Sequence, residues 1–107
     1  MLMNNYSAKL IRICNSGTIK VWIDLGFGVV LPNIKVHLKG VVSPTGVNGD
    51  RATEKLAELM PQQFLMEHHP AASEREGKFI ITIKLKGEFT TINQQLIDSG
   101  LVEKYQD

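Results

Sequence analysis

Three segments of this chain alternate apolar and polar side chains with a period of two, and this pattern restricts the possible folds most strongly. The segments are residues 18–25, 34–39 and 79–85. Because successive side chains of a strand point to opposite faces, each segment predicts a β-strand with one buried and one exposed face. Two shorter apolar runs, at residues 8–14 and 63–68, predict two more strands.

Two further segments have the spacing of amphipathic helices. Within residues 52–60, apolar side chains recur at offsets of four, seven and eight, and Asp50 is the expected N-cap. The second helix is expected at residues 91–99, with Thr90 or Thr91 as its N-cap. The chain therefore contains three strands, a helix, two strands and a second helix, in that order.

This element order predicts one β-rich α+β domain over residues 1–107, because closing five strands into a small barrel removes their open edges. An apolar fraction of 43% is typical of a globular protein. The formal net charge of +1 means that any affinity for phosphate has to come from a local patch. No stretch approaches the roughly 18 apolar residues of a membrane span, and no leader pattern is present, so we expect a cytoplasmic protein without membrane contact.

Three other features carry reactive or charged side chains. Residues 74–78, Glu-Arg-Glu-Gly-Lys, predict a charged loop. His68 and His69 are adjacent in a predicted strand and so point to opposite faces, which argues against their binding one metal ion together. Cys14 lies in an apolar run and is expected to be a small buried hydrophobe rather than a reactive thiol.

Three sequence blocks occur in a characteristic order along the chain. Residues 14–21 contain a Gly-Thr turn that leads into a strand, and residues 36–45 combine a strand with a Gly-Val-Val-Ser-Pro-Thr segment. Residues 92–105 carry an Asn-x-x-Leu-Ile-x-x-Gly-Leu-x-x-x-Tyr pattern. Together they resemble the staphylococcal nuclease family over about residues 8–105. The resemblance implies a five-stranded OB-type barrel with two main helices, without the final C-terminal helix of that family.

The resemblance also implies that the acidic metal site of the family is absent. The two aspartates that hold calcium in active members align with Gly17 and Val42, which have no side-chain oxygen to offer a hard cation. The family's glutamate, which activates the attacking water, aligns with Thr45, and a hydroxyl is not a general base near neutral pH. We therefore expect no bound metal, no cofactor and a catalytically degenerate protein.

The cationic part of the family site is altered as well. Its two arginines align with His37 and with Lys78, which lack the forked guanidinium that binds phosphate in two places. Ser43 keeps a hydroxyl where the family often has threonine or alanine. The positions that match the family site are thus Gly17, His37, Val42, Ser43, Thr45 and Lys78.

The exposed faces of two predicted strands indicate a binding function. Trp22 is expected on the outer face beside cationic side chains, where it can stack a base between phosphate contacts. The alternative is that it packs under a helix or the first loop and that the lysines are simply solvated. The candidates for nucleic-acid contact are Lys20, Trp22, Lys35, His37, Lys39 and Lys78. The expected partner is nucleic acid or, equally, another protein, bound without catalysis.

Two alternatives remain open. The chain could be a divergent phosphodiesterase on DNA or RNA, either calcium-dependent or metal-independent. It would use His37, Ser43 and Lys78 with a relocated carboxylate, for which the candidates are Asp24, Asp50 and Glu54. The missing final helix would also leave an uncovered side near the C-terminus, where a second copy could bind and form a homo-oligomer.

Overall fold

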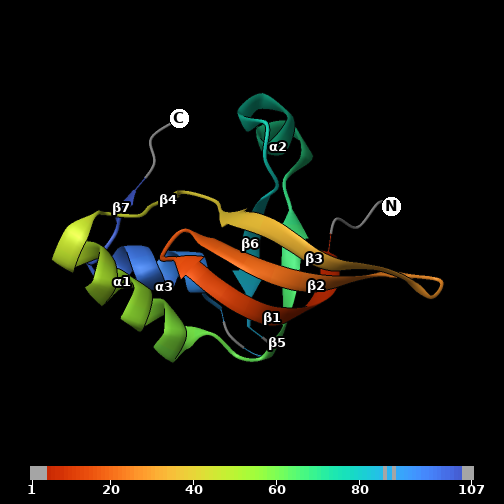
Figure 1. Ribbon diagram of the computed structural model, residues 1–107, viewed down its shortest axis with the longest axis horizontal. Coiled ribbons are helices and arrows are strands. Elements are labelled where there is room, and N and C mark those ends of the chain that lie inside the picture. Colours follow the sequence, from red (N-terminus) through yellow and green to blue (C-terminus); the bar gives the residue numbers. More distant parts are fainter. Residues whose placement is uncertain (1–4, 86, 88, 105–107) are drawn as a thin grey trace.

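Five strands close into a barrel in the order β1 (Asn5–Asn15), β2 (Thr18–Gly26), β3 (Val29–Leu38), β6 (Ile80–Lys84) and β5 (Gln63–His68). The computed structural model describes residues 5–85, 87 and 89–104, and Figure 1 shows the barrel strands side by side. Neighbours pair antiparallel, except that β3 and β6 run parallel. This is an OB-like barrel in an α+β domain, which confirms the expected fold class.

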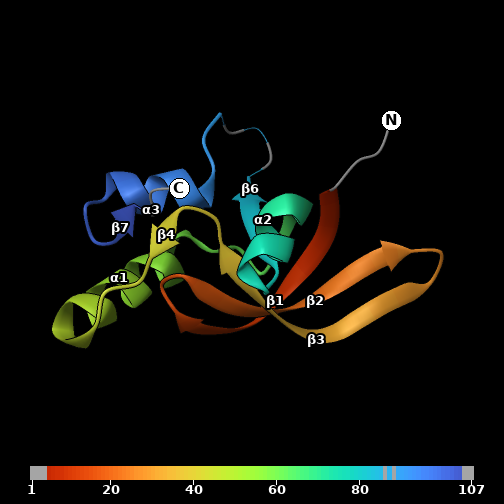
Figure 2. The same ribbon diagram turned by 90° about the horizontal axis from the view of Figure 1, so that it is seen from above.

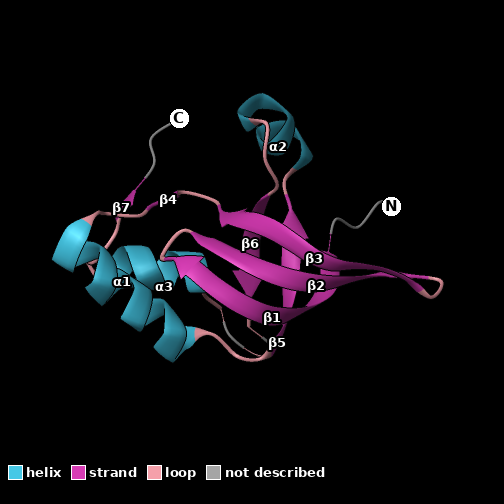
Figure 3. Cartoon of the chain, viewed as in Figure 1, coloured by secondary structure: helices cyan, strands magenta, loops and turns pink. Residues whose placement is uncertain are grey.

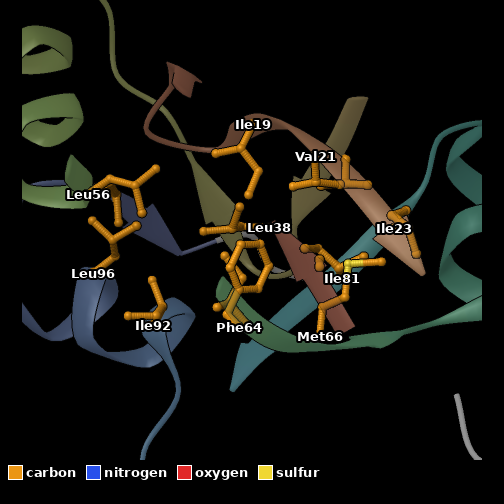
Figure 4. Close-up of a cluster of buried hydrophobic side chains, with 14 of the residues drawn as sticks. Ile19, Val21, Ile23, Leu38, Leu56, Phe64, Met66, Ile81, Ile92 and Leu96 are labelled. Carbon is orange, nitrogen blue, oxygen red and sulfur yellow. The ribbon is translucent and has the colours of Figure 1, made fainter. Parts of the chain in front are cut away.

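The alternating segments, together with β5, supply the barrel interior. Their inward side chains are buried and pack as one cluster, shown in Figure 4, that includes Ile19, Val21, Ile23, Val36, Leu38, Phe64, Met66, Ile81 and Ile83. The outward side chains of the same strands, among them Lys35 and Gln63, remain exposed. Burial of these apolar side chains is the main stabilising contribution to the fold.

Two helices close one end of the barrel. α1 (Gly46–Leu59) and α3 (Ile92–Asp98) contact each other, and Figure 4 shows Leu56 and Leu96 next to the strand side chains of the core. Thr91 caps α3 as expected, because its Oγ1 accepts a hydrogen bond of 3.1 Å from the amide of Gln94. A separate two-stranded sheet joins β4 (Val41–Val42) to β7 (Glu103–Lys104) beside this end.

The start of α1 differs from the prediction. The helix begins at Gly46, with Thr45 as its N-cap, so Asp50 lies inside the helix and not at its cap. Gly49 explains how the extra turn fits: a Cβ at this position would lie 2.4 Å from the carbonyl oxygen of Pro44. The chain can therefore pass this close to the helix only because residue 49 has no side chain.

The third helix was not predicted. Residues 74–78 do not form a charged loop throughout, because α2 (Pro70–Glu76) begins at a proline and ends at Gly77 in the left-handed conformation. The helix is only seven residues long, and Ser73 is its one buried residue. It thus lacks the apolar stripe by which a helix is recognised. Figure 3 shows α2 apart from the other two helices.

The side chain of Cys14 is exposed, contrary to the prediction of a small buried hydrophobe. Its neighbour Ile13 takes the inward position in the β1–β2 pairing, and an irregularity between Ile13 and Asn15 follows. Because the strand alternates, Cys14 faces outward. In the part of the chain that the structure describes, no helix is long and apolar enough to cross a membrane.

β2 and β3 continue well past the barrel as a two-stranded hairpin. Figure 2 shows this hairpin projecting at the end opposite α1 and α3. It turns at residues 26–28, where Phe27 has a positive φ of 55° between two glycines that also have positive φ. The amide of Gly26 donates a 2.8 Å hydrogen bond to Oδ1 of Asp24, which fixes the turn locally.

Candidate functional site

Cations from three neighbouring strands form a row on the outer face of the barrel. Arg12 of β1 lies opposite Lys20 of β2, and Lys20 lies opposite Lys35 of β3. Directly opposed side chains on one face of a sheet are only about 5 Å apart at Cβ, so this row concentrates like charge. Residues 5–38, which the structure describes in full, contain a single carboxylate, that of Asp24.

An aromatic platform lies next to this row. Trp22, two residues from Lys20 on the same face of β2, is only partly buried, and it pairs with Lys9 of β1. The Nζ atom of Lys9 lies 4.9 Å from the centroid of the indole ring, a cation–π contact. The outward position of Trp22 therefore agrees with the prediction, and the alternative of burial under a helix does not.

Trp22 borders a groove of about 1010 Å³ that runs over β1, β5 and the segment before α3. Lys9, Gln63, Lys84 and Phe89 are among the side chains that line it. Phe89 is fully exposed, and Lys84 is held by an ion pair of 3.2 Å with Glu67. The groove thus combines two aromatic rings with Lys9, the paired Lys84 and the carboxylate of Asp24, and the aromatic rings suit it to a flat ring.

A second hollow, of about 540 Å³, lies where β2 and β3 approach α2. It brings together five of the six positions predicted from the sequence as the counterpart of a nuclease site, namely Gly17, His37, Val42, Ser43 and Lys78. Thr45 is exposed at the start of α1 and is not part of the lining. Lys39, Lys104 and Arg75 also line this hollow, and Glu76 is the one carboxylate among its described lining residues.

Short hydrogen bonds fix the walls of this hollow. Ser16, which is completely buried, donates a 2.6 Å hydrogen bond from its hydroxyl to that of Ser43. The side chain of Asn15 accepts a 2.8 Å bond from the amide of Gly17, which closes the turn between β1 and β2. The hydroxyl of Ser43 is therefore engaged in this network, and it stays in place through a contact between segments 27 residues apart.

The imidazole of His37 is held at the rim of the hollow. Its Nδ1 lies 3.1 Å from Oγ1 of Thr18, across the β2–β3 pairing. Burial, together with the positive charges of Lys78 and Lys35, lowers the pKa of His37 below its ordinary value. His37 is therefore mostly neutral near neutral pH, and a bound anion would favour its protonation.

The structure does not bring a carboxylate cluster to this place. None of Asp24, Asp50 and Glu54, the acids considered as relocated ligands, lines the hollow. Among the described residues, no group of three or more His, Cys, Asp or Glu side chains could hold a metal ion. Lysine and neutral imidazole around a largely apolar floor favour an anionic group over a hard cation.

Lys9 and Arg12 are part of the cationic face, although neither was predicted from the sequence. Both lie in β1, whose pairing with β2 shifts between Leu10 and Arg12. This irregularity breaks the period-two pattern, so the sequence alone did not indicate which β1 side chains point outward. The contact of Lys9 with Trp22 joins residues 13 positions apart in the sequence, and it follows only from the strand pairing.

The fold and the site define a small OB-like barrel with a cationic and aromatic outer face. No protein-family model matches the chain, and no curated protein matches it. The function has to be argued from the surface chemistry of the barrel itself.

Proposed function

We propose that this protein is a catalytically degenerate barrel of the staphylococcal nuclease type that binds single-stranded nucleic acid across β1, β2 and β3. The observation that carries the proposal is the row Arg12, Lys20 and Lys35 beside the partly buried ring of Trp22, which borders the groove. Like charges in directly opposed positions of a sheet are destabilising. A row of three such side chains without a carboxylate indicates a polyanionic partner that removes this repulsion when it binds.

The chemistry of the face fits nucleic acid better than a protein surface. The lysine and arginine side chains would contact phosphates, while Trp22 would stack on a base, as in other barrels of this architecture. The hollow at the end of the face continues the positive charge through Lys39 and Lys78. Both parts lie along the strands that carry ligands in OB-type barrels, between the first hairpin turn and the segment that contains α2.

A single strand is the preferred form of the ligand. A base can stack on Trp22 only if it leaves its neighbours, and unstacking costs a few kcal/mol in a duplex. The ring of Trp22 is partly buried and borders the groove. A single flat base can therefore approach it from the groove, whereas the closed stack of bases in a duplex cannot. The row consists of two lysines and one arginine, which would contact the phosphate backbone and not the edges of the bases. We therefore expect little sequence preference.

The chain contains one tryptophan, so its intrinsic fluorescence reports directly on the proposed site. Titration with a single-stranded oligonucleotide is expected to change Trp22 emission in a saturable way, and duplex DNA of equal length is expected to bind more weakly. Lys20→Ala should weaken binding. Lys55→Ala, in α1 and outside both hollows, is the matched control and should not. No change at low salt would contradict the proposal, and binding of a protein with weak salt dependence would favour that other class of partner.

A second candidate function rests on the convergence of His37, Ser43 and Lys78 on one hollow. A phosphodiesterase could use the imidazole as a base and the lysine to stabilise charge on phosphate. The test is cleavage of single-stranded DNA or RNA with calcium or with a chelator. Cleavage that is lost in His37→Ala would establish this activity, whereas binding without cleavage in either condition would support the degenerate barrel.

A further inference from the structure

The hairpin that projects from the barrel carries an unusual concentration of exposed apolar side chains. Leu25, Phe27, Val29 and Val30 are all exposed, and Phe27 is exposed to 106% of its reference area, which means that it touches almost nothing. Figure 2 shows this tip well away from the barrel and from every helix. Contiguous apolar surface of this kind marks an interaction site in a folded protein.

One edge of the same hairpin has no partner strand. β3 pairs with β2 along its length, but with β6 only at His37 and Leu38. In the part of the chain that the structure describes, residues 29–36 therefore present unpaired backbone groups on the side of β6. An exposed strand edge is a template for pairing with another strand. Pro32 removes one donor from this edge, which limits any pairing to a short ladder.

A small apolar hollow of about 180 Å³ opens beside this edge, between the hairpin and the far end of the barrel. Tyr6, Leu25, Leu31, Ile34 and Phe79 are among its lining side chains. An apolar cavity of about 150 Å³ can take up a benzene ring. His68 lies at the wall with its ring edge-on to Phe79, and its buried Nε2 has no hydrogen-bond partner among the residues that the structure describes.

We propose that a second copy of this chain occupies this surface. In the dimer, the β3 edges pair antiparallel about a two-fold axis near Leu31, and Phe27 of each copy enters the apolar hollow of the other. With the axis at this residue, the turn at residues 26–28 of one copy lies beside residues 34–36 of its mate. Ile34 and Val36 line the hollow, so the tip of one hairpin reaches the hollow of the other copy.

The charge pattern favours a second copy as the occupant. Self-pairing about a two-fold axis sets a segment against itself, so any charge near the axis would meet the same charge. Residues 25–34 contain no charged side chain. The copy also supplies the ligand for the hollow, because a benzyl side chain matches its size and Phe27 cannot reach its own hollow from the tip of a paired hairpin. This surface differs from the C-terminal side at which the sequence predicts an oligomer.

Sedimentation equilibrium of the full chain without nucleic acid tests the proposal. The unmodified protein is expected to reach a dimer as its concentration rises, with little effect of salt, because the contact is apolar. Phe27→Asp should raise the dissociation constant roughly a hundredfold or more, since two buried rings are lost. The substitution leaves the monomer intact, because Phe27 is fully exposed and aspartate tolerates a positive φ.

Two further variants and one measurement complete the test. Phe27→Leu keeps an apolar side chain and should still form a dimer, and Val47→Asp, at an exposed apolar site in α1, should dimerise like the unmodified protein. Amide exchange at residues 29–36 should slow as the dimer forms. A protein that stays monomeric at high concentration, a dimer unaffected by Phe27→Asp, or open-ended assembly would each overturn the proposal.

Discussion

Lys20 of β2 stands directly opposite Lys35 of β3 on the outer face of the barrel, and Arg12 of β1 stands opposite Lys20 on the other side. No carboxylate of these three strands lies in this row, because Asp24 is four residues further along β2. The folded protein therefore contains an electrostatic repulsion that an uncharged or acidic side chain at one of these positions would remove. Proteins retain such a cost where a ligand of opposite charge uses it.

Replacing one member of the row should raise stability and lower affinity together. Lys35→Thr removes a like-charge contact and introduces a residue that suits a strand, so the free energy of unfolding should rise by about 0.2–1 kcal/mol. Affinity for a single-stranded oligonucleotide should fall. Urea unfolding and a binding titration on the same protein measure the two effects, and a loss of stability would show that Lys35 has a structural role.

Trp22→Ala should reduce affinity for a single strand by about 1–3 kcal/mol, the value of one stacked base. Trp22→Phe should keep most of it, because a phenyl ring still offers a flat face. Labelled oligonucleotide anisotropy is the appropriate measurement, since both variants lose the intrinsic signal. Equal affinities for the alanine and phenylalanine variants would mean that Trp22 contributes no stacking and serves only to hold Lys9.

Asn93 joins α3 to the barrel and should be the most sensitive polar residue in the fold. It is 5% exposed, its Oδ1 accepts from the amide of Ile83 at 2.9 Å, and its Nδ2 donates to the carbonyls of Lys39 and Ile81. Asn93→Leu keeps the volume but removes the partner of the Ile83 amide and of the Lys39 carbonyl, whereas the Ile81 carbonyl still accepts a 2.7 Å bond from the amide of Lys39. We expect a loss of about 2–4 kcal/mol in unfolding free energy, because each buried unpaired group costs about 1–3 kcal/mol. Thermal unfolding that matches the unmodified protein would contradict this role.

The lowered pKa of His37 has a consequence for stability at acid pH. In the unfolded chain the pKa of histidine is about 6.5. Below that pH the unfolded chain therefore binds more protons than the folded chain. Stability is therefore unaffected above about pH 6.5 and falls as the pH drops from there to the lowered value. His69, whose pKa is lowered mainly by burial, adds a change of the same sign.

His37→Gln should remove the His37 part of this change and leave the part due to His69. Binding should show the opposite trend in the unmodified protein: phosphate near His37 favours its protonated form, so affinity should increase as the pH falls toward the lowered pKa of His37. Urea unfolding and binding at pH 7.5 and 5.5 check both effects. Identical pH profiles for His37→Gln and the unmodified protein would exclude His37 as the titrating group.

The sequence predicted the elements whose periodicity is unbroken. The alternation in β2, β3 and β6 gave both the strands and the residues that face the core, and it placed Trp22, Lys20 and Lys35 on one outer face. Thr91 was recognised as a cap because its side chain acts within one turn of the chain. These are local properties, which a sequence encodes directly.

The features that the sequence did not reveal depend on irregular pairing or on distant contacts. The pairing shifts in β1 concealed the outward positions of Lys9 and Cys14, and the short α2 has no apolar stripe. The early start of α1 requires Gly49 to pass close to Pro44, which no local rule predicts. The hydroxyl contact of Ser16 with Ser43 likewise joins segments whose approach follows only from the closed barrel.

The salt dependence of binding tests the central claim most directly. If Arg12, Lys20 and Lys35 contact phosphates, the logarithm of affinity for a single strand should fall linearly with the logarithm of salt concentration, by about 0.7 per contact. The double variant Lys20→Ala with Lys35→Ala should then flatten the slope by about 1.4, while Lys55→Ala leaves it unchanged. A slope near zero, or one that the double variant does not alter, would contradict a nucleic-acid interface on this face.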